Sequence, residues 1–303
     1  MGRSSLRITH VLCPIDFSSS SRHALRYGAA VAKRFNTRMT VLFVNDPLLG
    51  SAAAAAAYDT RALAARTRTE LGAFTRRALG LAAESVEYAT AIGHPAPEIA
   101  KAVTRLGADL VVMASRGLSG PAKWFLGSTT EHVLRATKIP LLIIPNAAAR
   151  PHARWAKAMR SWPGRHAIVP IDLGREAQTQ VRAAMAVARA FEVAPLLLHV
   201  VAPPRWPAWM GVDSGAVNRA RYEEAQTRLE LLARRLGPGT ASRVASGDPA
   251  EQIIASAADL KSGLVILTLK RAGTRGPRRG AITYRLLCSG TVPVLALAPS
   301  AER

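Results

Sequence analysis

The chain has 303 residues, and 49% of them are hydrophobic, which is enough for two globular domains of ordinary size. Its 41 basic and 20 acidic residues give a formal net charge of +21, which attracts polyanions, but the basic residues are spread over both halves, so no specific nucleic-acid binder is indicated. No apolar run reaches the roughly 18 residues of a membrane span, and the first residues lack the apolar core of a secretory signal, so we expect a cytoplasmic protein without membrane contact.

The first half opens with an apolar, β-branched run at 8–15, which predicts a buried strand that ends just before Asp16. Ser18–Ser21 supply helix N-cap candidates, and apolar residues then recur at helical spacing as far as Phe35. A second buried strand is predicted at 39–44. A helix is predicted within 47–83, and a weaker strand at 85–91.

The rest of the first half begins with a proline-containing turn at the start of a helix, at 93–100. Two further apolar runs, 108–114 and 139–144, predict the last strands of this half. Between these runs lie a glycine-containing loop and a predicted helix at 129–137.

The second half repeats the first. THVLCPIDFS at 9–18 returns as HAIVPIDLG at 166–174, and GHPAPEIA at 93–100 returns as GDPAEQII at 247–254. A repeat of about half the chain length indicates two fused copies of one domain. The matching strands are predicted at 195–201, 242–245, 264–269 and 292–297, with helices within 203–236 and at 283–289.

The alternation of strands and helices predicts parallel sheets, with right-handed crossovers that place helices on both faces. The expected fold class is therefore α/β, with two tandem doubly wound domains that each contain a five-stranded parallel sheet. We expect the first domain at 1–150, a linker at 151–164 and the second domain at 165–303.

A binding site is predicted where strands of the first domain end, because ligands of such sheets bind outside the carboxyl ends of the strands. Asp16 follows the first strand and Val44 ends the second. Met113 and Ala114 end the fourth strand and lead into the glycine loop.

The loop that follows has the composition of an anion-binding loop. Gly117 lets backbone amides approach phosphate oxygens, and Gly127 is able to adopt a positive φ. Ser128 and Thr129 start the next helix, where N–H groups without intrahelical partners and side-chain hydroxyls can bind an anion.

These motifs resemble those of the universal stress protein family in its tandem two-domain form. The segments that carry the resemblance are PIDFS at 14–18, GHPA at 93–96, ASRGLSG at 114–120 and LGSTTEHVL at 126–134. The resemblance spans essentially the whole chain and is strongest over 8–145. It implies an adenine nucleotide α hydrolase-like fold and, for one subset of the family, ATP binding by a loop of the form Gly-x2-Gly-x9-Gly-Ser/Thr.

By this resemblance the first domain would bind ATP or a related adenine nucleotide, with Mg²⁺ as an optional companion. Asp16 would contact the adenosine part, Val44 would present its backbone to the adenine, and the loop would hold the phosphates. Arg116 and Lys123 would either add charge or lie on a solvated surface. The implied nucleotide-binding residues are Pro14, Ile15, Asp16, Val44, Met113, Ala114, Arg116, Gly117, Gly127, Ser128 and Thr129.

The sequence departs from the family loop at Ala114, which stands where the first glycine belongs. The second half departs further, with Arg271 in place of Gly117 and Ala281 in place of Ser128. We therefore expect nucleotide in the first domain and not in the second. Asp172 persists at the end of its strand, where an Asp also serves as a turn cap. Whether the basic loop 270–279 binds an anion stays open.

The resulting hypothesis is a regulatory stress-response protein with no catalytic residue assigned. The alternatives are a nucleotide-free dimerisation or partner-binding module of the same fold, and a slow ATPase. The resemblance also implies that the two domains pair through their last strands, at 141–144 and 294–297, while assembly into a homodimer stays open. Cys13 and Cys288 lie in apolar runs and are expected to be buried thiols, and the histidines lack the spacing of a zinc site.

Overall fold

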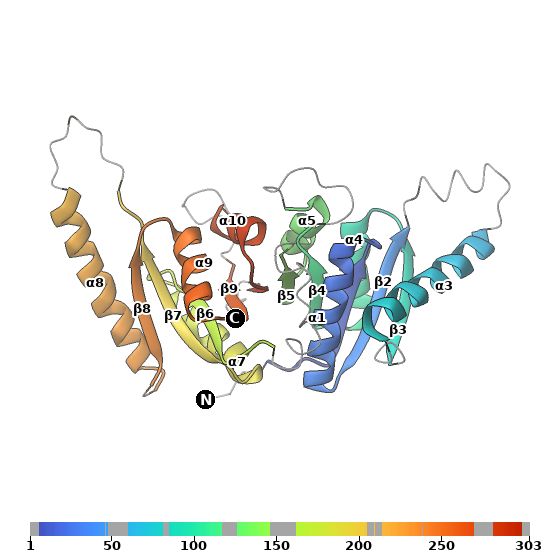
Figure 1. The fold of residues 1–303 in the computed structure, drawn as a ribbon, viewed down its shortest axis with the longest axis horizontal. Helices are drawn as coiled ribbons and strands as arrows, with labels where there is room; N and C mark the ends of the chain where they lie inside the picture. The colour runs from blue at the N-terminus through green and yellow to red at the C-terminus, as the bar shows by residue number, and fades with distance from the viewer. Residues whose placement is uncertain are drawn as a thin grey trace. The chain divides into compact units, whose positions relative to one another are not determined.

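The computed structural model describes residues 6–45, 47, 60–80, 85–116, 126–145, 162–204, 209, 214–237, 239–269 and 281–298. The fold is α/β, as predicted, and strands and helices alternate through both repeats (Figure 1). The first repeat contains β1 (His10–Ile15), α1 (Ser19–Phe35), β2 (Arg38–Asn45), α3 (Thr60–Leu79), β3 (Val86–Ile92), α4 (Pro95–Leu106), β4 (Leu110–Ala114), α5 (Ser128–Ala136) and β5 (Leu141–Ile144). The second contains β6 (His166–Pro170), α7 (Ala177–Ala190), β7 (Ala194–Val201), α8 (Ser214–Arg234), β8 (Ala241–Ser246), α9 (Pro249–Asp259), β9 (Leu264–Thr268), α10 (Ala281–Ser289) and β10 (Val294–Leu297).

The sheet of the first repeat has the order β3-β2-β1-β4-β5, and its neighbouring strands are parallel. The chain therefore moves outward from β1 to β3 and then crosses to the other side of β1 to form β4. In the second repeat β9, β6, β7 and β8 follow the same plan and are also parallel. Both repeats thus have the doubly wound arrangement that alternating strands and helices predict.

The chain forms two compact units. One comprises Arg7–Trp162 together with Leu287–Ala298, and the other comprises Pro163–Leu286. In the first of these units β10 pairs antiparallel with β5, with Leu295 opposite Leu142.

The core of the first repeat lies on the two faces of its central strands. Every residue of β1 is buried, as are all residues of β4 and β5. Helix α1 packs against α3, and α4 packs against α5, so that each pair covers one face (Figure 1). Continuous burial explains why these strands read as uninterrupted apolar runs in the sequence.

The ends of α1 show how local sequence sets the helix boundaries. The Ser18 hydroxyl accepts a hydrogen bond from the Ser21 amide at 3.0 Å, as predicted for an N-cap. At the other end Asn36 adopts a left-handed conformation with φ 47°, and Glu192 does the same after α7 with φ 51°. A left-handed residue that ends this helix is thus a feature that both repeats share.

Several arginines donate to backbone carbonyl groups outside the helix and strand ladders. Arg26 donates to the carbonyl of Ala78 at 3.2 Å, and Arg221 donates to the carbonyl of Ala202 at 2.9 Å. Arg228 donates in the same way to the carbonyl of Leu173. Some of the many arginines therefore provide hydrogen bonds to carbonyl groups at the ends of helices and strands.

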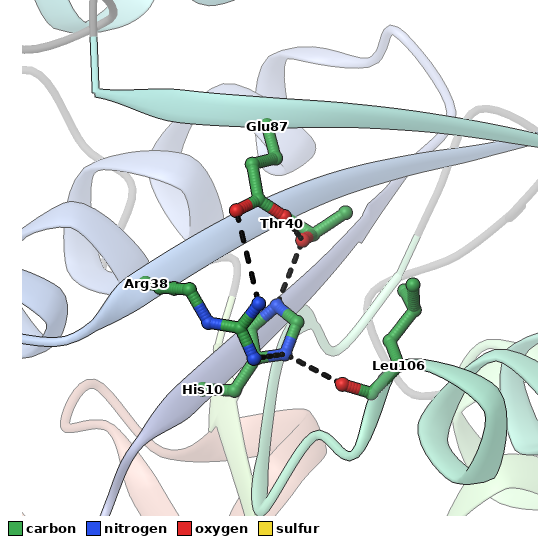
Figure 2. Close-up of polar contacts among 5 residues, drawn as sticks. All are labelled: His10, Arg38, Thr40, Glu87 and Leu106. Carbon is green, nitrogen blue, oxygen red and sulfur yellow. Dashed lines mark hydrogen bonds and ion pairs between the residues drawn. The ribbon is translucent and has the colours of Figure 1, made fainter.

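A polar network lies at the amino end of β1, opposite to the edge where ligands are expected (Figure 2). The His10 ring is buried, and its Nδ1 donates to the carbonyl of Leu106 at 2.9 Å. Its Nε2 lies 2.8 Å from the hydroxyl of Thr40, which donates to the Glu87 carboxylate at 3.1 Å. Arg38 lies 4.0 Å from the other oxygen of this carboxylate. The network joins β1, β2, β3 and the end of α4.

Replacement of the central hydroxyl should destabilise the protein. Thr40→Val keeps the shape of the side chain but leaves the buried Nε2 of His10 without its partner, so we expect a loss of about 1–3 kcal/mol in the free energy of unfolding. Urea denaturation measures this difference. Thr90→Val, at an exposed position of β3, is the control and should change the stability by less than about 0.5 kcal/mol. Equal stability of the two variants would show that the network contributes nothing.

Candidate functional site

The candidate site lies at the carboxyl ends of β1, β2 and β4, which are neighbours in the order β2-β1-β4. Ile15 at the end of β1 is in register with Phe43 of β2, one residue before Val44. Since the winding direction reverses between β1 and β4, this edge is the topological switch point where open α/β sheets bind ligands. Asp16, Val44 and Ala114 therefore reach the same edge of one sheet.

Asp16 is held in a defined position by the start of α1. One carboxylate oxygen, Oδ1, accepts hydrogen bonds from the Ser21 hydroxyl at 2.6 Å and from the Ser18 amide at 3.1 Å. The Asp16 amide donates to the same Ser21 hydroxyl at 3.1 Å. Pro14 and Ile15 precede it as buried residues of β1 and do not face solvent.

Phe17 follows Asp16 in a conformation that is rare for a bulky residue, with φ 62°. Its ring lies 4.6 Å from that of Phe43 and 5.4 Å from that of Phe74, measured between centroids. The guanidinium of Arg22 lies 5.5 Å from the centroid of the Phe74 ring. We call Phe17, Phe43 and Phe74 the aromatic cluster, which supports the turn between β1 and α1.

Basic side chains surround the first turns of α1. Burial lowers the pKa of His23, and the charges of Arg26 and Arg22 lower it further, against the opposing effect of its hydrogen bond with the Ser19 carbonyl. Burial also raises the pKa of Tyr27 to about 12. Burial at this part of the fold thus disfavours the charged forms of both His23 and Tyr27.

The start of α5 is fixed to the end of β4 by two hydrogen bonds. The Gly127 amide donates to the carbonyl of Ser115 at 2.8 Å, and the Thr130 hydroxyl donates to the carbonyl of Ala114 at 2.9 Å. Met113 and Ala114 are buried, whereas Ser128 is exposed and Thr129 is half-buried. The two bonds place the amino end of α5, with its N–H groups and hydroxyls, directly beside the end of β4.

Gly127 suits its position for a different reason from the one we expected. Its φ is −62°, so the positive φ that glycine allows is not used. A Cβ atom built on it would lie 3.3 Å from the carbonyl oxygen of Ser115 and 3.4 Å from Cα of Arg116. Close approach of α5 to β4, which a single-residue pattern does not reveal, is therefore the constraint on this glycine.

The other residues of the predicted loop are placed less completely. Arg116 is half-buried, and its guanidinium donates to the carbonyl of Cys288 at 3.3 Å. Val44 is half-buried at the end of β2. Gly117 and Lys123 lie outside the described residues.

Three residues near this edge were not predicted. Thr130 fixes α5 to the end of β4, and the run of three hydroxyl residues at the start of this helix could have indicated such a role. Phe17 adopts a positive φ that no local pattern indicates. Ser115 is fully buried, and its hydroxyl has no partner among the described residues.

The second repeat builds the corresponding turn differently. Gly174 and Ala177 stand where the first repeat has Ser18 and Ser21, and Asp172 is exposed. Thr268 ends β9 as a half-buried residue. Arg271 and Gly280 lie outside the described residues, as does the basic loop 270–279, and Ala281 is the first residue of α10.

Helix α10 is tied to the start of α9 by a charged group. The Asp248 carboxylate caps α9 by accepting from the Glu251 amide at 3.1 Å, and its second oxygen accepts from Arg285. Arg285 also donates to the Glu251 carboxylate at 3.2 Å. Burial acts to raise the pKa of Asp248, but the hydrogen bonds from the Glu251 amide and from Arg285 outweigh it, and the pKa is lowered.

The two cysteines are free and buried, as predicted. Burial raises the pKa of the Cys13 thiol, which keeps it protonated and unreactive. Among the described residues, no three His, Cys, Asp or Glu side chains are grouped as a metal ion would need. The helices that the structure describes include none with the length and apolar character of a membrane span.

The family model for the universal stress protein family matches this chain twice, at residues 7–145 and 164–298. Universal stress protein MJ0531 of Methanocaldococcus jannaschii is 28% identical over 140 residues, which cover 44% of this chain and 80% of that protein. The crystal structure of a universal stress protein from Archaeoglobus fulgidus has the same fold, with a TM-score of 0.59 and 19% identity over 97% of this chain and 100% of that chain. A universal stress protein solved in complex with cAMP is 23% identical over 46% of this chain and 98% of that chain, with a TM-score of 0.34.

The carboxylate of Asp248 should make the free energy of unfolding depend on pH. Its folded-state pKa is lowered below the unfolded value of about 3.9, so it stabilises the protein above that pH and the stabilisation is lost as the pH falls through the folded-state value. Asp248→Ser keeps the N-cap but removes the charge, and should flatten the decline of the unfolding free energy between about pH 5 and 2. Asp248→Ala removes the cap as well and should also lower stability at pH 7. An unchanged pH profile in both variants would contradict the assignment.

Proposed function

The chain belongs to the universal stress protein family, and from this membership and the geometry of the first repeat we propose that the first repeat binds ATP or a related adenine nucleotide. The single observation that carries the proposal is the convergence of an oriented Asp16 and the anchored start of α5 at one edge of the sheet. We propose that the protein acts in the cytoplasm as a stress-response regulator without a strong catalytic activity.

Each part of the site has a distinct role in this proposal. The Asp16 carboxylate accepts hydrogen bonds from hydroxyl groups of the ribose, and the backbone at Val44 faces the adenine. The N-cap of α5 is Gly127, which provides no side-chain cap for the first N–H groups of the helix. These N–H groups and the hydroxyls of Ser128 and Thr129 suit phosphate oxygens. Mg²⁺ would then accompany the phosphates as their counter-ion.

Roles for the remaining predicted residues follow from their burial. Pro14, Ile15, Met113 and Ala114 are buried, so they would contribute backbone groups and shape instead of side-chain contacts. Arg116, which donates to the Cys288 carbonyl, would reach a phosphate only after giving up that bond. Gly117 would line the phosphates through its backbone.

The second repeat is proposed to be a structural or regulatory partner that binds no nucleotide. It lacks the two serines that hold Asp16, and Ala281 replaces the hydroxyl of Ser128. The last strands of the two repeats, β5 and β10, are proposed to join the domains, and the antiparallel register of Leu142 and Leu295 supports this pairing. The proposed domain limits are 1–150 and 165–303, with a linker at 151–164, and further assembly into a homodimer would use the surfaces that this pairing leaves exposed.

A nucleotide-free interaction module is the competing function. Two observations favour it: Ala114 stands at the first glycine of the loop, and Oδ1 of Asp16 already accepts two hydrogen bonds within its own turn. Mass spectrometry of small molecules released from freshly purified, denatured protein distinguishes the two functions. Co-purified adenine nucleotide supports the first, and protein that carries none while failing to bind added nucleotide supports the second.

Binding should depend on the first repeat alone. Gly127→Arg forces a side chain between α5 and the end of β4 and should abolish ATP binding, measured by isothermal titration calorimetry at up to millimolar ATP. Ala281→Ser, at the corresponding position of the second repeat, is the matched control and should bind as the unsubstituted protein does. Circular dichroism spectra of the two variants should match that of the unsubstituted protein, which would show that both are folded. Equal losses in the two variants would contradict the assigned asymmetry, and no saturable binding to the unsubstituted protein would end the proposal.

A further inference from the structure

The turn between β1 and α1 contains a backbone conformation that the fold itself does not require. Phe17 has φ 62°, a value that is energetically unfavourable for a residue with a Cβ and a large side chain. Leu173 occupies the same position in the second repeat, between the corresponding strand and helix, and does not have a positive φ. The second repeat therefore connects the corresponding strand and helix without this strain, through a turn in which Gly174 and Ala177 stand in place of the two serines.

Other strained positions behave differently. Asn36 and Glu192, which end α1 and α7, are both left-handed, so this conformation recurs wherever the shared architecture needs it. The positive φ of Phe17 is absent from the second repeat, and so are the serines that hold Asp16. Strain that occurs beside a binding group, and disappears where that group loses its supports, indicates a functional constraint.

The aromatic cluster keeps Phe17 in this conformation. Its ring packs on Phe43 at 4.6 Å with an interplanar angle of 54° and meets Phe74 edge-on at 5.4 Å. At the corresponding positions of the second repeat, Leu173 replaces Phe17 and His199 replaces Phe43, and His199 donates to the carbonyl of Ile171. Arg228 of α8 donates a hydrogen bond to the carbonyl group of Leu173.

The strained residue lies between the two ends of the hydrogen-bonded turn around Asp16. The carboxylate accepts from the amide of Ser18, the residue that follows Phe17, at 3.1 Å. It also accepts from the Ser21 hydroxyl at 2.6 Å. A change of φ at Phe17 rotates the Ser18 amide relative to the carboxylate, so the two bonds depend on the left-handed conformation.

We propose that Phe17 is a positioning residue, which the aromatic cluster holds in a left-handed conformation so that the Asp16 carboxylate faces the vicinal hydroxyl groups of a ribonucleotide. This inference rests on the proposed function of the first repeat, which places ribose hydroxyl groups against Asp16, and it adds the residue that orients the carboxylate toward them. A carboxylate acts only as an acceptor, so it pairs with ribose hydroxyl donors and gains nothing from a 2′-deoxyribose at that position.

The test compares ATP with 2′-deoxy-ATP by isothermal titration calorimetry. The unsubstituted protein should bind ATP about tenfold more tightly, the effect of one hydrogen bond to a charged group. Phe17→Leu, which copies the second repeat, should weaken ATP binding about tenfold and bind both nucleotides equally. Phe17→Tyr keeps the ring and should keep the preference, and Leu173→Phe is the matched control in the second repeat and should change nothing. A Phe17→Leu variant that retains the preference for ATP overturns the proposal.

A second measurement tests, without any nucleotide, whether Phe17 holds the Ser18 amide in position against Asp16. Amide hydrogen exchange of Ser18, followed by NMR, should be about tenfold faster in Phe17→Leu than in the unsubstituted protein, because the bond to Asp16 is weakened. Exchange at the Ser21 amide, which donates to the Ser18 hydroxyl, reports whether α1 remains capped. If neither nucleotide binds but Ser18 exchanges faster, the nucleotide function is wrong and the positioning role stands. Equal exchange at Ser18 means that Phe17 positions nothing.

Discussion

The burial of β1 between two parallel neighbours is the constraint on which the rest of this structure depends. Its residues form ladder bonds with β2 on one side and β4 on the other, and all six of them are buried. Polar groups are therefore confined to the two ends of the strand. The amino end carries the buried His10 network, and the carboxyl end carries Asp16. The separation of the structural network from the candidate site follows directly from this burial.

Comparison of the two repeats shows which sequence features are needed to pack a buried central strand. Apolar strand positions, the helix-ending left-handed residues and the glycines before α4 and α9 recur, because each compact unit must pack its own sheet. The serines around Asp16 and the hydroxyl of Ser128 at the start of α5 do not recur. Packing has kept the copies alike, while the chemistry at the carboxyl edge has diverged.

The fold was predictable from sequence because apolar runs and helical spacing report burial residue by residue. The site was predictable only as a set of neighbours at one sheet edge. The conformation of Phe17 depends on rings from β2 and α3, and the need for glycine at 127 depends on a carbonyl group twelve residues earlier in the chain. The direction of the Arg116 side chain depends on a helix end in the last part of the chain. Such contacts between distant segments leave no local periodicity from which they could be predicted.

The arginines that donate to carbonyl groups have a consequence for the response of this protein to its surroundings. A guanidinium is planar and presents several N–H donors in a fixed geometry, and Arg26, Arg221 and Arg228 each use it to hold a carbonyl group at the end of a helix or strand. A lysine would lose geometric fit at the same places, and a histidine would lose its charge near neutrality. Substitution of any of these three arginines would therefore lower the net charge and also remove a donor from a backbone carbonyl group, so that solubility and stability would change together.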